Sequence, residues 1–94
     1  MSYDLEFVAS ALKEWRKISP GIRDQLKNKL GERLQNPHVP AARLHGLPDC
    51  YKIKLRTAGY RLVYQVNDQV VVVTVIAVGK RDKGLVYRLA DKRV

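Results

Sequence analysis

Six cationic side chains and three tyrosines gather in the second half of the chain, and their types favour chemistry on phosphate groups. From Tyr51 to Arg56 apolar and cationic residues alternate, so the period of a strand places Lys52, Lys54 and Arg56 on one face. Three like charges this close repel one another, and a bound anion would relieve the repulsion. The whole set comprises Lys52, Lys54, Arg56, Arg61, Lys80, Arg81, Tyr60, Tyr64 and Tyr87.

Such a set could cleave RNA without a catalytic histidine. In that reaction the ribose 2′-hydroxyl loses a proton and attacks the adjacent phosphate, negative charge grows in the transition state, and the 5′-oxygen leaves with a proton. Arg and Lys stabilise the growing charge, and Arg matches phosphate geometry with two parallel donors. A tyrosine or lysine among cations loses its proton more readily and can serve as a base. The residues alone rank none of the three tyrosines, and they equally allow a basic surface that binds nucleic acid without cutting it.

Other catalytic and metal-binding arrangements are missing from the sequence. It has no Gly-rich phosphate loop, and its nine acidic residues are scattered among basic neighbours. His38 and His45 lack metal-ligand spacing on a helix and are interpreted as solvent or packing residues. Cys50 is the only cysteine, which excludes an internal disulfide and a zinc site with several thiolates. We interpret it as a small residue at the start of a strand, and we expect neither a metal nor a cofactor.

Length and charge narrow the class of protein further. The 94 residues allow one domain, 1–94, with one modest core. The net charge of +9 predicts an anionic partner, and residues 41–94, with 11 basic against 4 acidic residues, hold most of the excess. Asp4 and Glu6 place acidic charges in the N-terminal stretch, which argues against a signal peptide. The longest apolar run, 70–78, is too short to span a bilayer. These features predict a cytoplasmic protein without a membrane partner.

Residues 1–36 predict a strand followed by two helices. Weak alternation over 2–8 indicates a short strand, and apolar residues at helical spacing from Val8 to Ile18 indicate the first helix. Ser19-Pro20 predicts the start of a second helix that ends at Asn36-Pro37. The cations of both helices are expected on solvated faces, where they are available to backbone phosphates of a large RNA; they are Lys13, Arg16, Lys17, Arg23, Lys27, Lys29 and Arg33.

The second half predicts a sheet and a final helix. Residues 36–49, which hold three of the four prolines, are interpreted as a loop, and 50–66 as a hairpin that turns at Thr57-Ala58-Gly59. The run 70–78 predicts a central strand buried on both faces that ends at Gly79. A short helix should begin near Leu85, with fraying over 91–94. The order βααβββα defines an α+β domain, with two N-terminal helices packed on a mainly antiparallel sheet and a short C-terminal helix.

Two short motifs and several longer strings of this sequence resemble a known family. Leu44–Gly46 and Tyr60–Tyr64 match the Leu-x-Gly and Tyr-Arg-x-x-Tyr patterns of the RelE/ParE superfamily of toxins. Longer strings are similar to the RelE branch of that superfamily over nearly the whole chain. They span residues 11–17, 46–56, 59–66 and 78–81.

The resemblance implies a ribosome-dependent endoribonuclease that cuts mRNA in the A site and so stops translation. It implies that Lys52 and Lys54 position or activate the 2′-hydroxyl, Arg61 holds the scissile phosphate, and Arg81 assists the leaving oxygen. Tyr87 would stack on a base and is the favoured general base, although Lys52 and Lys54 stay open for that role. The helical cations, with Arg56 and Lys80, would dock onto RNA of the 70S ribosome.

The resemblance also implies partners and rivals. The expected partner is an acidic RelB-like antitoxin, partly disordered alone, that neutralises the cationic face and carries the pair to operator DNA, where the pair represses its own operon. The first alternative is a ParE-type toxin of the same fold that acts on DNA gyrase, whose members generally do not keep Lys52, Lys54, Arg61, Arg81 and Tyr87 together. The second is a non-catalytic basic module that binds nucleic acid with steep salt dependence.

Overall fold

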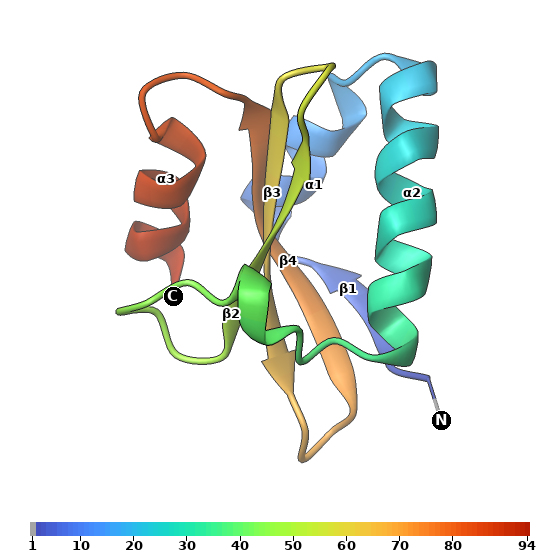
Figure 1. Cartoon of the computed structure of the whole chain (residues 1–94), viewed down its shortest axis with the longest axis vertical. Coiled ribbons are helices and arrows are strands. Elements are labelled where there is room, and N and C mark those ends of the chain that lie inside the picture. Colours follow the sequence, from blue (N-terminus) through green and yellow to red (C-terminus); the bar gives the residue numbers. More distant parts are fainter. Residues whose placement is uncertain (1) are drawn as a thin grey trace.

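One four-stranded sheet with helices on both faces forms the body of the molecule (Figure 1). The computed structural model describes residues 2–94 and confirms the α+β class and the order βααβββα. The elements are β1 (Asp4–Phe7), α1 (Ala9–Arg16), α2 (Pro20–Gln35), β2 (Cys50–Leu55), β3 (Tyr60–Asn67), β4 (Val72–Lys80) and α3 (Leu85–Arg93), with a short 3₁₀ turn at Pro40–Ala42.

The sheet has the strand order β1-β4-β3-β2. Strands β2, β3 and β4 pair antiparallel, and β1 pairs parallel to β4, so the sheet is mainly antiparallel as predicted. β4 lies inside the sheet, in agreement with its run of β-branched residues. In the register of the hairpin, Lys54 pairs with Arg61, and Arg61 pairs with Gly79 of β4. This register brings cations from two strands to the same point of one face.

The two faces of the sheet are covered unequally. The face under α1 and α2 carries the larger apolar core, in which Leu26 and Leu30 of α2 pack with Ile53 and Leu62. On the other face α3 packs through Val86 and Ala90 onto a smaller cluster that includes Cys50, Val63, Ile76 and Ala77. A helix of nine residues covers only part of a sheet face. Next to it, at the end of the sheet that holds the β2–β3 turn, cationic side chains occupy the face instead.

Several predicted boundaries are wrong, and tertiary contacts explain most of the differences. The strand predicted over 70–78 runs from Val72 to Lys80, because the turn after β3 includes Val70, which is 61% exposed, and Val71, which has a φ of 56°. Gly79 continues the strand through its pairing with Arg61. The segment 91–94 does not fray before Arg93, whose guanidinium is held by Glu14. The first strand and the first helix are shorter than predicted, and the side chain of Ser19 makes no cap hydrogen bond.

Two further predictions concern membranes and metals. Across residues 2–94, none of the helices has the length and apolar character that a membrane span requires. Within the same residues, no cluster of three or more His, Cys, Asp or Glu side chains is placed to bind a metal ion.

Candidate active site

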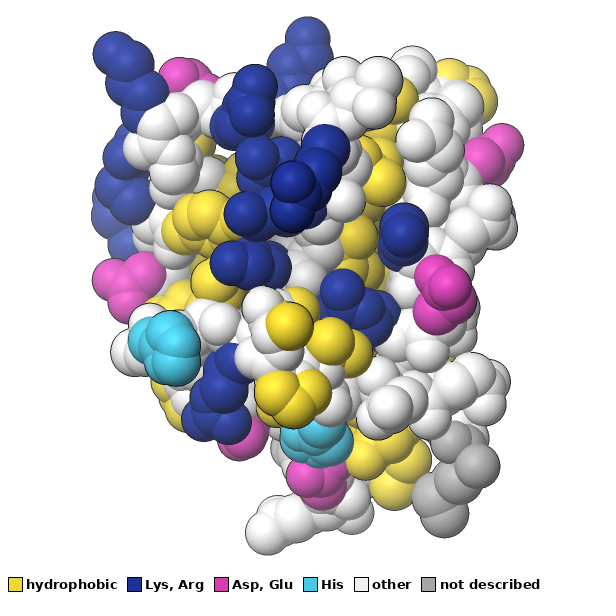
Figure 2. Space-filling view, viewed as in Figure 1, with side chains coloured by type: hydrophobic (Ala, Val, Ile, Leu, Met, Phe, Trp, Pro, Cys, Tyr) yellow, Lys and Arg dark blue, Asp and Glu magenta, His cyan; other side chains and the backbone are white. Residues whose placement is uncertain are grey.

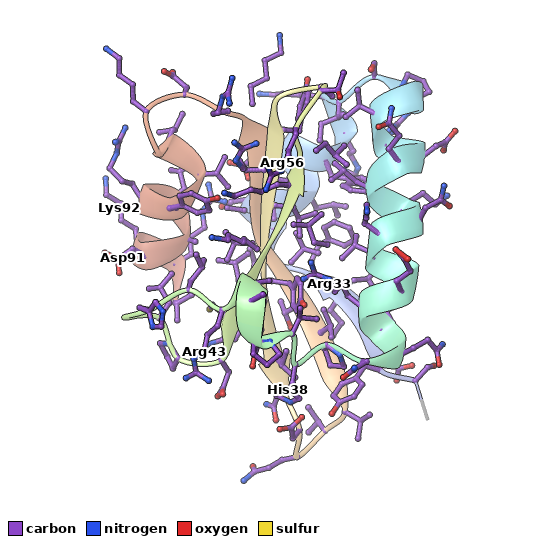
Figure 3. The ribbon with its side chains drawn as sticks, viewed as in Figure 1. Arg33, His38, Arg43, Arg56, Asp91 and Lys92 are labelled. Carbon is purple, nitrogen blue, oxygen red and sulfur yellow. The ribbon has the colours of Figure 1, made fainter. Side chains whose placement is uncertain are left out.

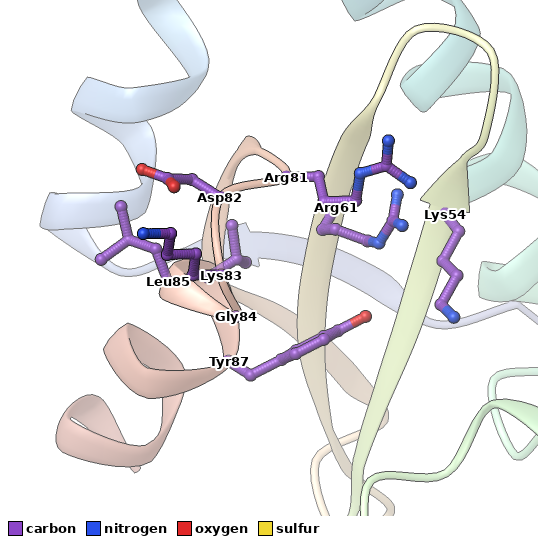
Figure 4. A pocket seen from close by; sticks show the side chains of 9 residues that line it. Lys54, Arg61, Arg81, Asp82, Lys83, Gly84, Leu85 and Tyr87 are labelled. Carbon is purple, nitrogen blue, oxygen red and sulfur yellow. The ribbon is translucent and has the colours of Figure 1, made fainter.

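A cleft of about 470 Å³ opens between the β2–β3 hairpin and the start of α3 (Figure 4). Four of the five predicted catalytic residues line it, namely Lys54, Arg61, Arg81 and Tyr87. The rest of its wall comes from the segment that leads into α3 and from the first residues of α3, to which the sequence assigned no role in the site. That wall consists of Asp82, Lys83, Gly84, Leu85 and Val86.

Backbone geometry fixes the positions of the four side chains. Lys54 and Arg61 sit opposite each other on neighbouring strands. The N–H of Arg81 donates to the carbonyl of Gly59 at 2.6 Å, which ties the end of β4 to the turn of the hairpin. Gly59 has a φ of 73°, a conformation that glycine adopts without a Cβ penalty. The positive φ of Gly84, 75°, then reverses the chain into α3 and brings Tyr87 over the cleft.

The cations of the cleft have no carboxylate partners. Among residues 2–94 the ion pairs within 4.0 Å are His38–Asp68 and Glu14–Arg93, and neither lies in the cleft. Asp82 lines the wall, but its carboxylate points away from the guanidinium groups of Arg61 and Arg81 in Figure 4. The positive charge is therefore uncompensated, as expected of a surface that receives an anion.

Repulsion within the cluster lowers the pKa of Lys54 below its ordinary value. The nearby charge of Lys52 is the main cause, followed by partial desolvation and by Arg61 and Arg56. A lysine with a lowered pKa is neutral in a larger fraction of molecules, and only the neutral amine can accept a proton. This favours Lys54 as one candidate for the base, beside Tyr87.

Tyr87 presents a buried hydroxyl to the cleft. Its Oη is shielded from solvent and, within residues 2–94, makes no hydrogen bond. In Figure 4 this oxygen points from α3 toward the side chains of Arg61 and Lys54. A buried hydroxyl without a partner is unfavourable, and a substrate oxygen that displaces the atoms covering it would satisfy it.

The other two candidate tyrosines lie elsewhere. Tyr64 is fully buried on the opposite face, where its hydroxyl donates to the Pro37 carbonyl at 2.8 Å and accepts from Arg33 at 2.9 Å. Burial raises the pKa of Tyr64, although the neighbouring guanidinium of Arg33 opposes the shift. Tyr60 packs against the same core beneath the N-terminal helices. The structure thus distinguishes Tyr87 from two residues that the sequence could not separate from it.

Lys52, the fifth predicted catalytic residue, lines a neighbouring groove of about 280 Å³ instead of the cleft. Lys54 belongs to both hollows, so they form one continuous basic surface. Figure 2 shows Lys and Arg side chains gathered over this part of the molecule, between α2 and α3. The groove is lined by Arg33, Val39, Ala41, Ala42, Lys52, Lys54 and Arg56.

Arg33 corrects one prediction. The helical pattern placed it on the solvated side of α2, but its guanidinium points to the sheet and donates to the Lys52 carbonyl at 3.1 Å as well as to the Tyr64 hydroxyl (Figure 3). It also lies over the Tyr64 ring, 5.7 Å from the centroid. Two partly buried hydrogen bonds thus hold the side chain against the sheet. The RNA contact predicted for Arg33 stays a prediction. To make it, the guanidinium would have to bind RNA while it also holds the Lys52 carbonyl and the Tyr64 hydroxyl.

The remaining predicted binding residues are spread over other surfaces. Lys13, Arg16, Lys17, Lys27 and Lys29 are exposed on α1, on α2 and just after α1, as predicted, while Arg23 is partly buried. Arg56 is exposed at the hairpin turn beside the groove. Lys80 lies in a separate hollow with Glu14, Lys17 and Tyr60, so the structure does not bring it to the cleft.

The histidines and the cysteine have structural surroundings. His38 bridges the Tyr51 hydroxyl, at 2.9 Å, and the Asp68 carboxylate, at 2.8 Å, which supports its interpretation as a packing residue. His45 is exposed on the loop before β2. Cys50 is buried at the start of β2, and burial raises the pKa of its thiol to about 11, with a smaller effect from Asp49. A thiol of this pKa stays protonated at neutral pH and is a weak nucleophile.

Comparison with known families identifies the class of protein that this fold and cleft define. The family model described as the ParE toxin of the type II toxin–antitoxin system parDE matches residues 5–84. This match covers α1, α2, β2, β3, β4 and all of β1 except Asp4, together with Lys54, Arg61 and Arg81. The chain therefore belongs to the ParE toxin family of type II toxin–antitoxin systems.

Individual relatives place the chain in the RelE branch of this family. It is 58% identical over 94 residues to the mRNA interferase toxin RelE of Escherichia coli strain K12, covering 100% of this chain and 99% of the relative. The solved structure of an arginine-to-alanine double mutant of E. coli RelE in the free state matches this fold with a TM-score of 0.92. The two sequences are 57% identical, and the match covers 100% of this chain and 99% of the mutant chain. The toxin in the intact E. coli RelBE toxin–antitoxin complex is 58% identical, with a TM-score of 0.84 over 87% of this chain and 100% of the other.

Proposed function

We propose that this protein is the toxin of a type II toxin–antitoxin pair and that it cleaves mRNA as a ribosome-dependent endoribonuclease. The curated relative that is 58% identical over the whole chain is an mRNA interferase. One observation in the structure carries the proposal. The hydroxyl of Tyr87, which has no hydrogen-bond partner among residues 2–94, faces Lys54 and Arg61, which have no carboxylate partner there, in a cleft that Arg81 also lines.

This arrangement supports in-line attack within the RNA strand. The scissile phosphate sits against Arg61 and Arg81, whose donors stabilise the charge that grows on its oxygens. A base takes the proton of the ribose 2′-hydroxyl, the 2′-oxygen forms a bond to phosphorus, and the bond to the 5′-oxygen breaks. Arg81 donates a hydrogen bond to the leaving 5′-oxygen, which takes its proton from water. The products are a 2′,3′-cyclic phosphate and a 5′-hydroxyl, and no water is consumed in this step.

The base is Tyr87 as the phenolate or Lys54 as the neutral amine. Tyr87 has the position, because its oxygen is oriented by α3 into the cleft. Lys54 is the alternative because Lys52 lowers its pKa, which leaves a larger fraction of the amine neutral and able to accept a proton. We favour Tyr87 as the base and place Lys54 beside the 2′-hydroxyl, where its charge stabilises the alkoxide. Lys52 acts on Lys54 through its charge and binds the strand in the adjoining groove.

Ribosome dependence is supported by the distribution of charge outside the cleft. Exposed cations on α1 and α2 provide contacts to phosphates of ribosomal RNA that are independent of the reacting phosphate. In this proposal the ribosome holds the mRNA strand and the toxin supplies the charged cleft. Such a division places the protein in the cytoplasm, where translation occurs.

The proposed partner is an antitoxin similar to RelB. The E. coli toxin that is 58% identical has been solved in a complex of that kind. An acidic segment that folds on the toxin would neutralise the uncompensated charge of the cleft and groove. We propose that the pair also represses its own operon, with the antitoxin as the part that contacts operator DNA.

Primer extension on mRNA held on purified ribosomes with an empty A site tests the function, with the same mRNA free in solution as control. Cuts confined to the A-site codon, and only in the presence of ribosomes, are expected. Intact mRNA in both samples, from folded protein, would overturn the proposal. Because the matching family model describes ParE toxins, a gyrase supercoiling assay on the same protein then tests the alternative.

A further inference from the structure

The last turn of α3 is joined to α1 by a clasp that spans the edge of the sheet. The carboxylate of Glu14 accepts two hydrogen bonds from the guanidinium of Arg93, at 2.9 and 3.0 Å. Both side chains are largely withdrawn from solvent, with 24% and 20% of their surface exposed. We propose that this pair, the Glu14–Arg93 clasp, positions Tyr87 for the cleavage reaction, an inference that rests on the proposed function.

The clasp fills a gap in the backbone pairing of β4. β1 pairs only with Val72 to Val75, so the outer edge of β4 lacks a strand partner beyond that point. There the N–H of Val78 donates to Glu14 at 3.2 Å, and Arg93 donates to the carbonyl of Ile76 at 2.9 Å. The two side chains thus take the place of a strand on this edge. Loss of either one leaves the other charge half-buried and a backbone group without its partner.

The ends of α3 depend on this contact because the apolar anchors of the helix lie in its middle. A nine-residue helix is not stable by itself in water. It begins after Gly84 without a side-chain cap, and Leu85 in its first turn is exposed. Arg88 donates to the Lys83 carbonyl, a bond within the helix start that does not reach the sheet. Apolar packing through Val86 and Ala90, with Tyr87 and Leu89 partly buried beside them, holds the middle of the helix, and the clasp is the polar contact that fixes its far end.

Tyr87 is the part of α3 that reaches the reaction, and within residues 2–94 its hydroxyl has no hydrogen bond to hold it. It lies six residues before Arg93, about 9 Å along the helix. A rotation or shift of α3 that follows loss of the clasp is therefore transmitted to the Tyr87 hydroxyl. Neither Glu14 nor Arg93 lines the cleft, so both are positioning residues that act through Tyr87.

A mutant cycle measures whether Arg93 acts through Tyr87. The variants are Arg93→Ala, Tyr87→Phe and the double variant, with Arg93→Lys as the conservative change. Lys92→Ala removes an exposed cation from the same turn and is the matched control. On ribosome-bound mRNA we expect Arg93→Ala to lower kcat on the order of tenfold to a hundredfold with little change in KM. Arg93→Lys should recover most of the loss, and Lys92→Ala should match the wild type.

In the Tyr87→Phe background the further loss from Arg93→Ala should be less than about threefold, because interacting residues are not additive. An equal loss in both backgrounds overturns the proposal, since it shows that Arg93 supports the fold without acting through Tyr87. Where Arg93→Ala does not fold, Glu14→Gln provides the same cycle, because its amide oxygen still accepts from Val78.

Hydrogen exchange of the α3 amides provides a readout that needs no RNase activity. Arg93→Ala should accelerate exchange over 85–93 and leave α2 unchanged. Unchanged exchange in α3 overturns the clasp as its anchor. If the wild type itself cuts no mRNA, the proposed function fails, and the exchange result still decides whether Glu14 and Arg93 hold the helix.

Discussion

Arginine and tyrosine meet on both faces of the sheet, with opposite outcomes. On the face under α2, Arg33 donates to Tyr64, and Tyr64 donates to Pro37, so the buried polar groups are paired. On the face beside α3, Arg81 lies in the cleft without an acid partner, and the hydroxyl of Tyr87 has no hydrogen-bond partner among residues 2–94. The residue types are the same, and only the pairing differs.

The comparison shows why residue type alone does not identify a reactive site. A paired arginine lowers the free energy of the fold, and its charge is not available to a ligand. An unpaired arginine in a cleft leaves the fold with repulsion that a phosphate removes. We assign the Arg33–Tyr64 pair to stability and the Arg81–Tyr87 side to function.

The largest expected effect comes from the unpaired side. Arg81→Ala should lower mRNA cleavage on the order of 100- to 1,000-fold, because one donor to the transition state is lost. Ribosome binding should weaken only slightly, and the melting temperature should not fall. Primer extension and a ribosome pelleting assay measure the two properties. Arg43→Ala, an exposed arginine outside the cleft, is the control (Figure 3). If ribosome binding and cleavage fell in parallel, Arg81 would be a residue that binds the ribosome and not one that acts in the cleavage step.

Removal of one hydroxyl from each tyrosine separates the two sides most sharply. Tyr87→Phe should lower cleavage about 100-fold and leave the free energy of unfolding unchanged or slightly higher, because a buried unpaired group is removed. Tyr64→Phe should lower the free energy of unfolding by about 1–3 kcal/mol, since Arg33 and Pro37 lose a partner, and the folded protein should cleave normally. Denaturant titration and primer extension measure both. The reverse pattern would contradict the assignment.

Two arginines of the basic groove test the same contrast at a smaller scale. Arg33→Ala should destabilise the protein by about 1–3 kcal/mol, because two partly buried acceptors lose their donor. Arg56→Ala should leave stability unchanged and reduce the salt slope of RNA binding by about 1. Urea unfolding and binding titrations at several salt concentrations provide the values. A loss of stability in the Arg56 variant would show that Arg56, like Arg33, supports the fold.

The smallest expected effect is a change in the titration of Lys54. Because Lys52 is the main cause of its lowered pKa, Lys52→Gln should raise the pKa of Lys54 toward its ordinary value. NMR of the lysine side chains measures the shift, and Lys92→Gln is the distant control. Since the folded state lowers this pKa, the repulsion costs stability while Lys54 is protonated, and stability should rise as pH passes through the folded pKa toward the unfolded one. In the Lys52→Gln variant this rise of stability with pH should disappear.

Local patterns in the sequence predicted much of the fold and pointed to four of the residues that line the cleft. Alternation over 51–56 placed the cations of β2 on one face, and the β-branched run correctly marked β4 as an inner strand. The resemblance to the RelE branch singled out Tyr87. The structure adds a physical reason for that choice, because Tyr60 and Tyr64 face the other core.

What the sequence did not predict depends on contacts between distant residues. Arg33 fits a solvated helical position, and only the fold shows Tyr64 and the Lys52 carbonyl within its reach. The end of α3 looked like a fraying terminus because Glu14, 79 residues away, is not visible as a partner in a local pattern. The predicted start of the strand at Val70 was wrong for a similar reason. The turn after β3 requires Val70 and Val71, although both have high β propensity.

The central claim is that the unpaired groups of the cleft promote attack by a ribose 2′-hydroxyl, and a single-atom change in the substrate tests it most directly. An A-site mRNA with one 2′-deoxynucleotide on the 5′ side of the scissile phosphate is compared with the all-ribose strand on the same ribosomes. The account predicts a 2′,3′-cyclic phosphate end from the all-ribose strand and no cut at that position in the deoxy strand. Equal cleavage of both strands would contradict it.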